Sequence, residues 1–129
     1  MNYNQRRKIH PAMGACGLLG FMGFLGIAFN EPTFCSFFSF FGFISWYWYG
    51  KLAREQWDER LVANQLRATN KAMSLCFSSI FAGMILIGNF IGFDNTALAY
   101  PALIILVSLG FATAFNLTAY LTWKYDRED

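Results

Sequence analysis

The chain has 129 residues, of which 56% are hydrophobic, 19% aromatic and only 14% charged, with a net charge of +2. A water-soluble domain usually carries about a quarter charged residues. The charges are also uneven, because residues 11–50 contain only Glu31 and residues 72–123 contain only Asp94. Stretches this long and apolar exclude an ordinary soluble domain and predict an integral membrane protein.

Each apolar stretch is about twice the ~20 residues that one helical span needs. A polar, turn-forming run divides each of them, Asn-Glu-Pro-Thr in the first and Phe-Asp-Asn-Thr in the second. We therefore expect an all-α fold with a single membrane domain over 1–129, in which four transmembrane helices form two antiparallel hairpins. The expected spans are 11–29, 33–50, 72–92 and 97–123, with a cytoplasmic helical connector over 51–71.

The basic residues predict the orientation of these spans. They lie before the first span, in the connector or after the fourth span, and neither hairpin turn has one. The positive-inside rule therefore predicts a multi-pass protein of the cell membrane with both termini in the cytoplasm. The Trp-Tyr run at 46–49 agrees, because these aromatic residues collect at membrane interfaces. The ten basic residues are Arg6, Arg7, Lys8, Lys51, Arg54, Arg60, Arg67, Lys71, Lys124 and Arg127.

A small residue recurs at every third position in both of the first two spans. Small residues let membrane helices approach closely, so both series are predicted to pack helices together. An antiparallel hairpin is expected to pair them in depth as Gly26 with Ser36, Gly23 with Ser39, Gly20 with Gly42, and Gly17 with Ser45. The complete set is Gly14, Gly17, Gly20, Gly23, Gly26, Ser36, Ser39, Gly42 and Ser45.

This spacing does not fit a straight α-helix, in which each residue turns about 100° and a step of three drifts by about 60°. A long 3₁₀ helix would align every glycine, but such runs are uncommon. We therefore expect the glycines to contact different neighbours at different depths, with the first span near the centre of the bundle. Two alternatives are a simple repeat that the membrane tolerates and a substrate path lined by glycine.

Polar residues within the later spans are predicted to act in packing. Asn116 and the pair Ser78–Ser79 are expected at similar depth, where a hydrogen bond can join their helices. No acidic or basic residue lies inside a span, which argues against an active transporter.

The sequence predicts no chemical site. Its cysteines, Cys16, Cys35 and Cys76, form no CxxC pair, and the single histidine, His10, lies outside the spans. No catalytic residue, metal or cofactor is therefore expected, and the chain is not expected to be an enzyme. The basic residues are interleaved with acidic ones, so direct nucleic-acid binding is not expected either.

The connector is the only sizeable surface predicted to face the cytoplasm. It contains no glycine or proline, and Lys51 and Glu55 are spaced to pair on a helix. A protein partner can dock there, and the alternative is a solvated connector that faces lipid headgroups. The residues predicted for docking are Arg54, Trp57, Asp58, Glu59, Arg60 and Leu61.

The segments GLLGFMGFLG and SFFSFFGFISWYW, followed by Asp-Glu-Arg at 58–60 and Asn-Lys-Ala at 70–72, resemble a family of small bacterial membrane proteins. This family, common in Firmicutes, has glycine–phenylalanine tripeptide repeats and is described as a domain of unknown function. The resemblance covers about the first 75 residues and transfers no catalytic residue. It implies a helix-turn-helix regulator as a partner.

The leading hypothesis is a non-enzymatic membrane protein that acts through protein partners, in a regulatory, immunity or accessory-subunit role. Its expected partners are membrane lipid and either a helix-turn-helix regulator or a transporter component. The alternative is a small channel or exporter assembled as a homo-oligomer.

Overall fold

The structure, a computed structural model, describes residues 10–52 and 59–128. It is all-α with four helices, as the sequence predicts. Each of the first two helices begins as a 3₁₀ helix and continues as an α-helix, whereas the last two are α-helical throughout. In chain order the elements are η1 (Pro11–Met22) with α1 (Gly23–Ala28), η2 (Pro32–Ile44) with α2 (Ser45–Leu52), α3 (Glu59–Phe90) and α4 (Thr96–Glu128).

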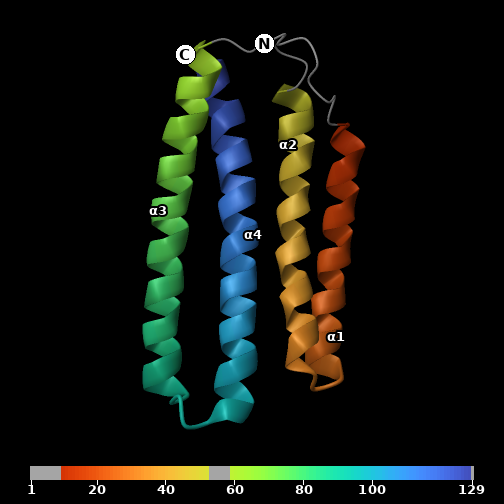
Figure 1. The fold of residues 1–129 in the computed structure, drawn as a ribbon, viewed down its shortest axis with the longest axis vertical. Coiled ribbons are helices and arrows are strands. Elements are labelled where there is room, and N and C mark those ends of the chain that lie inside the picture. The colour runs from red at the N-terminus through yellow and green to blue at the C-terminus, as the bar shows by residue number, and fades with distance from the viewer. Residues whose placement is uncertain (1–9, 53–58, 129) are drawn as a thin grey trace, which may run out of the picture.

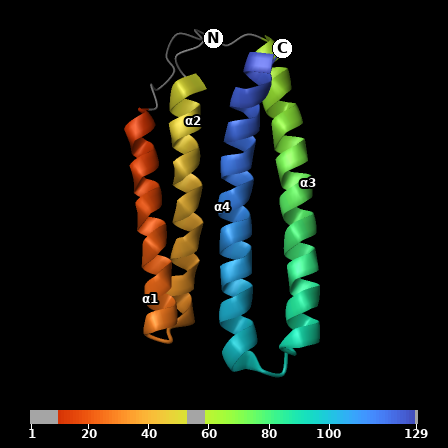
Figure 2. The same cartoon turned by 180° about the vertical axis from the view of Figure 1, so that it is seen from behind.

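The helices form an open row. Figures 1 and 2, seen from opposite sides, show the order α3, α4, α2, α1 across the molecule. Among the described residues, the backbone of α3 packs beside α4 alone, and η1 with α1 packs beside η2 and α2 alone. The prediction that the first span lies near the centre of a bundle is therefore wrong: this helix lies at the edge of the row.

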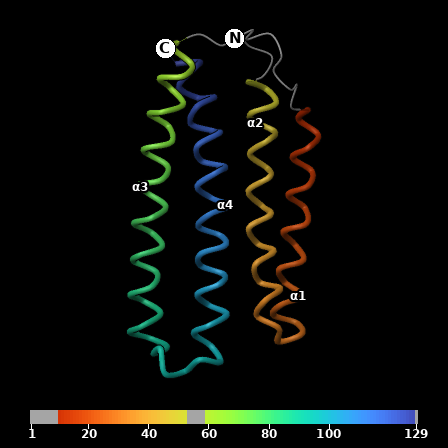
Figure 3. The backbone as a smooth tube through the Cα atoms, in the orientation of Figure 1, coloured from red at the N-terminus to blue at the C-terminus, as the bar shows by residue number. Residues whose placement is uncertain are grey.

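Both hairpin turns lie at one end of the row, and the other end holds the start of η1, the end of α2, the start of α3 and the end of α4 (Figure 3). Both turns need residues that tolerate a left-handed backbone, and Asn30 (φ 55°) and Gly92 (φ 77°) supply it. Asn and Gly adopt this conformation more readily than other residues, which explains why the polar breaks of the sequence become tight turns.

The three-residue spacing is realised as 3₁₀ helix. η1 has 12 residues and η2 has 13, both far longer than the usual 3₁₀ run. With three residues per turn, every third residue lies on one side of the helix. A single neighbouring helix, formed by η2 and α2, therefore contacts the whole glycine series of the first helix. The expectation that the glycines contact different neighbours at different depths is therefore wrong.

The register of the hairpin also differs by one residue from the predicted pairing. A Cβ atom added at Gly20 would lie 2.6 Å from the Phe41 ring, and one added at Gly23 would lie 2.7 Å from the Phe38 ring. Gly20 and Gly23 therefore each face a large side chain of η2 instead of another small residue. This arrangement fills the space that the glycines leave, whereas two facing series of small residues would leave a gap.

Two small residues of the second helix, Gly42 of η2 and Ser45 of α2, lie toward the second hairpin or are buried. A Cβ atom added at Gly42 would lie 3.5 Å from the Ala112 Cα atom of α4, and Ser45, next in the series, is only 2% exposed. In the described part of the chain, the helix formed by η2 and α2 thus has three rows of side chains. One row packs on the η1 glycines and one lies toward α4. The third, Phe34, Phe37, Phe40, Phe43 and Trp46, forms a stack of aromatic rings.

Three helices of the described chain are long and apolar enough to cross a membrane: Pro11–Ala28, Glu59–Phe90 and Thr96–Glu128. The helix formed by η2 and α2 is not among them, because serines and the Trp-Tyr run lower its mean hydropathy. The 3₁₀ rise of ~2.0 Å per residue, against ~1.5 Å in an α-helix, lets Pro11–Ala28 reach about 33 Å with only 18 residues.

Candidate functional site

The end of the row opposite the hairpin turns carries the basic residues. In the described ranges these are Lys51 on α2, three residues on the first part of α3 and two on the last turns of α4. One ion pair joins described residues here, between Lys124 Nζ and Glu128 Oε1 at 3.5 Å. Most of this positive charge is therefore not neutralised by described carboxylates. The residues on α3 and α4 are Arg60, Arg67, Lys71, Lys124 and Arg127.

The first turns of α3 pack along the last turns of α4. Leu61 (1% exposed) and Ala68 (0%) are buried in this seam, and Ala68 packs with Leu121 and Tyr125 of α4. Asn64 is 6% exposed, and its Nδ2 atom has no hydrogen-bond partner. This seam fixes the connector part of α3 as a continuation of the long helix.

The predicted docking residues are separated by this packing. Arg54, Trp57 and Asp58 lie outside the described residues. Glu59 and Arg60 are exposed, and Arg60 Nη2 donates a hydrogen bond to the Asp126 carbonyl oxygen at 3.2 Å. Leu61 is buried, so its side chain belongs to the helix seam and not to an exposed docking surface.

An exposed apolar pair lies on the same part of α3. Val62 is 53% exposed and Leu66 is 63% exposed, one helical turn apart. This pair was not predicted from the sequence, and Leu61, which is buried in the seam with α4, was predicted for docking instead. Val62 and Leu66 are four residues apart, which places them on one face of a helix, so the sequence does contain the pattern that predicts this pair.

Aromatic rings and cations form a cluster between α2 and α4. The Trp48 ring lies 4.9 Å from the Trp123 ring and 5.3 Å from the Tyr120 ring, measured between centroids. The Lys51 Nζ atom lies 4.4 Å from the Tyr47 centroid, 5.2 Å from that of Trp48 and 5.6 Å from that of Trp123. These distances are within the range of cation–π attraction.

A second cation shares the Trp123 ring. The Arg127 Cζ atom lies 4.4 Å from its centroid. Arg67 of α3 makes a similar contact, with its Cζ atom 4.7 Å from the Tyr125 centroid. The Trp-Tyr run at 46–49 was predicted as an interface marker, but the contacts of Lys51 with Trp123 and of Arg67 with Tyr125 were not predicted, since each joins residues from different helices.

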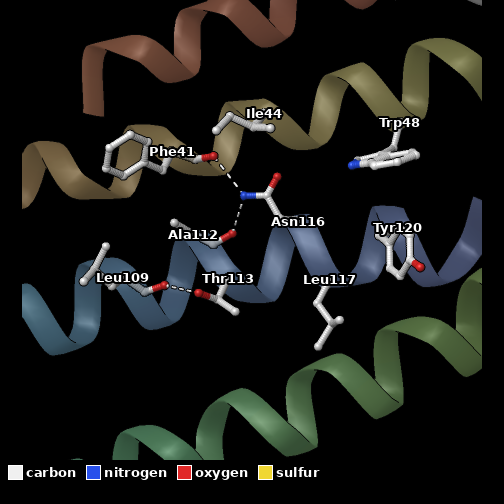
Figure 4. Close-up of a pocket in the computed structure, with 9 residues that line it drawn as sticks. All are labelled: Phe41, Ile44, Trp48, Leu109, Ala112, Thr113, Asn116, Leu117 and Tyr120. Carbon is white, nitrogen blue, oxygen red and sulfur yellow. Dashed lines mark hydrogen bonds between the residues drawn. The ribbon is translucent and has the colours of Figure 1, made fainter. Parts of the chain in front are cut away.

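A groove of about 440 Å³ begins beside this cluster and runs between the second helix and α4 (Figure 4). Trp48 and Tyr120 stand at one end, with Phe41 and Leu109 toward the other. Its walls are mainly apolar. The remaining lining residues are Ile44, Ala112, Thr113, Asn116 and Leu117.

Asn116 joins the two helices beside this groove. Its Nδ2 atom donates to the Phe41 carbonyl oxygen of η2 and to the Ala112 carbonyl oxygen of its own helix, both at 2.9 Å (Figure 4). The expected bond to Ser78 or Ser79 is not the one formed, and Ser79 Oγ donates to the Leu75 carbonyl oxygen. α4 packs against both α3 and η2, and the Asn116 side chain bonds to η2.

These features offer binding surfaces and no set of reacting groups. Within residues 10–52 and 59–128, no three His, Cys, Asp or Glu side chains gather where they could hold a metal ion. Cys35 and Cys76 are buried and Cys16 is exposed, all as free thiols. What the arrangement can do is bind a charged or apolar partner at its basic end.

Comparison with known proteins gives no match, either to a protein family, to a curated protein or to a solved structure. The resemblance to the glycine–phenylalanine repeat proteins therefore stays a prediction.

Proposed function

We propose that this chain is an integral membrane protein of four spans with both termini and the 51–71 connector in the cytoplasm. It acts without enzymatic chemistry, through protein partners that dock on its basic end. The role is regulatory, protective in immunity, or that of an accessory subunit. The expected partner is a helix-turn-helix regulator, as the resemblance to the repeat family implies, or a transporter component.

The placement in a membrane is supported by three helices long and apolar enough to cross one. Both hairpin turns lie opposite the basic end, and Asn30 and Asp94 stand in or beside turns that contain no lysine or arginine. The positive-inside rule therefore supports a cytoplasmic basic end. The helix formed by η2 and α2 is proposed as a further span, second in chain order, because it runs antiparallel to η1 and parallel to α4 along the row.

The observation that carries the docking proposal is the exposed pair Val62 and Leu66 on the basic end of α3. Apolar side chains at the centre of a polar rim are typical of protein interfaces. Here the rim includes Glu59, Arg60 and Arg67. This surface suits a partner helix with one apolar face and acidic flanks.

Site-specific photo-crosslinking in living cells of the native host tests the proposal. A benzophenone side chain is placed at Leu66, and the matched control is Leu75, which is 52% exposed on the same helix but within the predicted span. We expect Leu66 to capture one protein that Leu75 does not. Its identity, from mass spectrometry, distinguishes a regulator from a transporter component.

A second variant checks that the captured protein binds this surface. Val62→Glu is expected to remove the capture at Leu66 while leaving the amount of membrane-inserted protein unchanged. Capture of lipid alone would contradict partner docking, and capture of a second copy would instead favour the oligomeric channel or exporter.

A further inference from the structure

We propose that an anionic glycerophospholipid binds along the seam between α2 and α4, with its phosphate at Lys51 and Arg127 and an acyl chain in the groove below them. The proposal rests on the membrane placement given under Proposed function. It is independent of the docking of any protein partner.

The headgroup position follows from the placement of two cations on one ring. The Lys51 Nζ and Arg127 Cζ atoms lie 5.6 and 4.4 Å from the Trp123 centroid. Neither forms an ion pair with a carboxylate of residues 10–52 or 59–128. Two like charges that share one ring repel each other, so the binding of an anion in this region is favoured.

A phosphate suits this position chemically. Its oxygens accept charge-assisted hydrogen bonds from an ammonium and a guanidinium group, which remain able to donate while they lie over aromatic rings. Basic pockets between membrane helices on the cytoplasmic side are known to take phosphate headgroups of anionic lipids. The Trp-Tyr run that brings Lys51 here is typical of the headgroup level.

The acyl-chain position follows from continuity between the cluster and the groove. Trp48 and Tyr120 belong to both, because Trp48 contacts the Trp123 ring and each lines the groove. Below them the walls include Ile44, Leu109 and Leu117 (Figure 4). A ligand that fills both parts needs a phosphate at one end and a hydrocarbon at the other.

The polar groups of the groove do not favour a polar ligand instead, because Asn116 Oδ1, which has no hydrogen-bond partner, is buried and the other side-chain polar groups of Asn116 and Thr113 are hydrogen-bonded. Asn116 Nδ2 already donates to two carbonyl oxygens. Thr113 Oγ1 donates to the Leu109 carbonyl oxygen, which leaves its methyl group for apolar contact. The groove therefore fits an apolar chain, and a free inorganic phosphate would use only the cationic end.

Native mass spectrometry of the purified full chain tests the proposal, with equal amounts of dioleoyl phosphatidylglycerol and dioleoyl phosphatidylcholine. We expect at least fivefold more bound phosphatidylglycerol. The double variant Lys51→Gln/Arg127→Gln is expected to lower this ratio below twofold. The matched control Lys71→Gln/Lys124→Gln removes two charges from the same end and is expected to keep the ratio within twofold of the unchanged chain.

A groove-filling variant tests the acyl-chain position. Thr113→Phe is expected to lower phosphatidylglycerol binding at least threefold. Val107→Phe, at a 50% exposed position of the same helix that does not line this groove, is expected to leave it unchanged. Circular dichroism and gel filtration check that each variant folds. If the double variant Lys51→Gln/Arg127→Gln does not fold, Arg127→Gln alone takes its place in the lipid-binding comparison.

Several results would overturn the proposal. These are equal binding of the two lipids, an equal loss in the Lys71/Lys124 control, or displacement of the lipid by inorganic phosphate at the same concentration. Because no protein partner is present, such results leave the docking surface on α3 untouched. Release of the chain from membranes by alkaline extraction would overturn the membrane placement, and with it both proposals.

Discussion

At the scale of single residues, the hairpin depends on glycines that have no room for a side chain. A Cβ atom at Gly26 would lie 2.7 Å from Cys35 Sγ and 2.8 Å from its backbone nitrogen. Backbone atoms cannot move aside as a flexible side chain can. Gly42 differs, because the nearest atom to an added Cβ lies at 3.5 Å, an ordinary contact distance.

Gly26→Ala is expected to lower the free energy of unfolding by about 1–3 kcal/mol, because an extra methyl group must displace packed atoms. Gly42→Ala is expected to be neutral or to stabilise by up to about 1 kcal/mol, since alanine favours helix more than glycine does. Unfolding in a denaturing-detergent titration, followed by circular dichroism, compares the two. Equal destabilisation by both variants would contradict the packing of the glycine series.

Asn116 offers a second residue-scale test, with Asn89 as its matched control. Both asparagines donate to the carbonyl oxygen four residues earlier, but only Asn116 also reaches another helix. Asn116→Ala is expected to cost about 0.6–2 kcal/mol, the range for hydrogen bonds between membrane helices. Asn89→Ala is expected to change stability by less than about 0.5 kcal/mol. The same unfolding titration measures both, and an equal cost would show that the bond to Phe41 is not stabilising.

At the scale of elements, the unusual feature is the pair of long 3₁₀ helices. Side chains at i and i+3 eclipse in this geometry, which normally limits its length. The sequence relieves the crowding with glycine in one row of η1. In η2 it uses the eclipsed rows for ring stacking, with Phe37 5.4 Å from Phe40 and Phe43 4.6 Å from Trp46.

A nitroxide scan of residues 33–44 in liposomes tests this geometry by collision with oxygen, which is concentrated in the lipid. The 3₁₀ structure predicts accessibility with a period of 3.0 residues along this segment, with minima at the buried Cys35 and Phe38. A period of 3.6 residues would indicate α-helix and contradict it.

Much of the fold could be predicted from the sequence. Polar runs and proline located the turns to within a few residues, because charged and turn-forming side chains are costly inside a membrane. The 3₁₀ geometry was not predicted. The small residues recur with a period of three, which indicates a 3₁₀ helix, but long 3₁₀ helices are rare and an α-helix was expected instead. The predicted register was wrong by one residue because small residues of the two helices were paired with each other. In the structure, Gly20 and Gly23 face phenylalanine side chains instead.

Less of the candidate site than of the fold could be predicted from the sequence. Six docking residues were predicted on the connector, but burial of Leu61 depends on how α4 packs against α3. Likewise, Lys51 and Arg127 meet at Trp123 only because α2 and α4 run parallel and side by side. Contacts between residues far apart in the sequence produce no local sequence pattern from which they could be predicted.

At the scale of the whole molecule, the helices form an open row that leaves large apolar side chains exposed on several helices. Phe90 is 84% exposed, and Phe29, Phe77 and Phe81 are each 67% exposed. In water this surface would promote aggregation, whereas lipid covers it at no comparable cost. The row and its basic end therefore have a consistent explanation in a membrane.

The proposed topology has all four helices crossing the membrane with the basic end inside. Three helices meet the length and hydropathy needed for a span, and η2 with α2 does not. The two alternatives place Asn95 on opposite sides of the membrane. With four spans, Asn30 and Asn95 both lie outside, whereas with three spans only Asn30 does.

Labelling of single cysteines in intact cells with a membrane-impermeant maleimide tests this most directly. The variants are Asn30→Cys, Asn95→Cys and Lys124→Cys in a chain without its own cysteines. The account predicts that the first two react from outside and that Lys124→Cys reacts only after permeabilisation. Protection of Asn95→Cys in intact cells, or labelling of Lys124→Cys from outside, would contradict it.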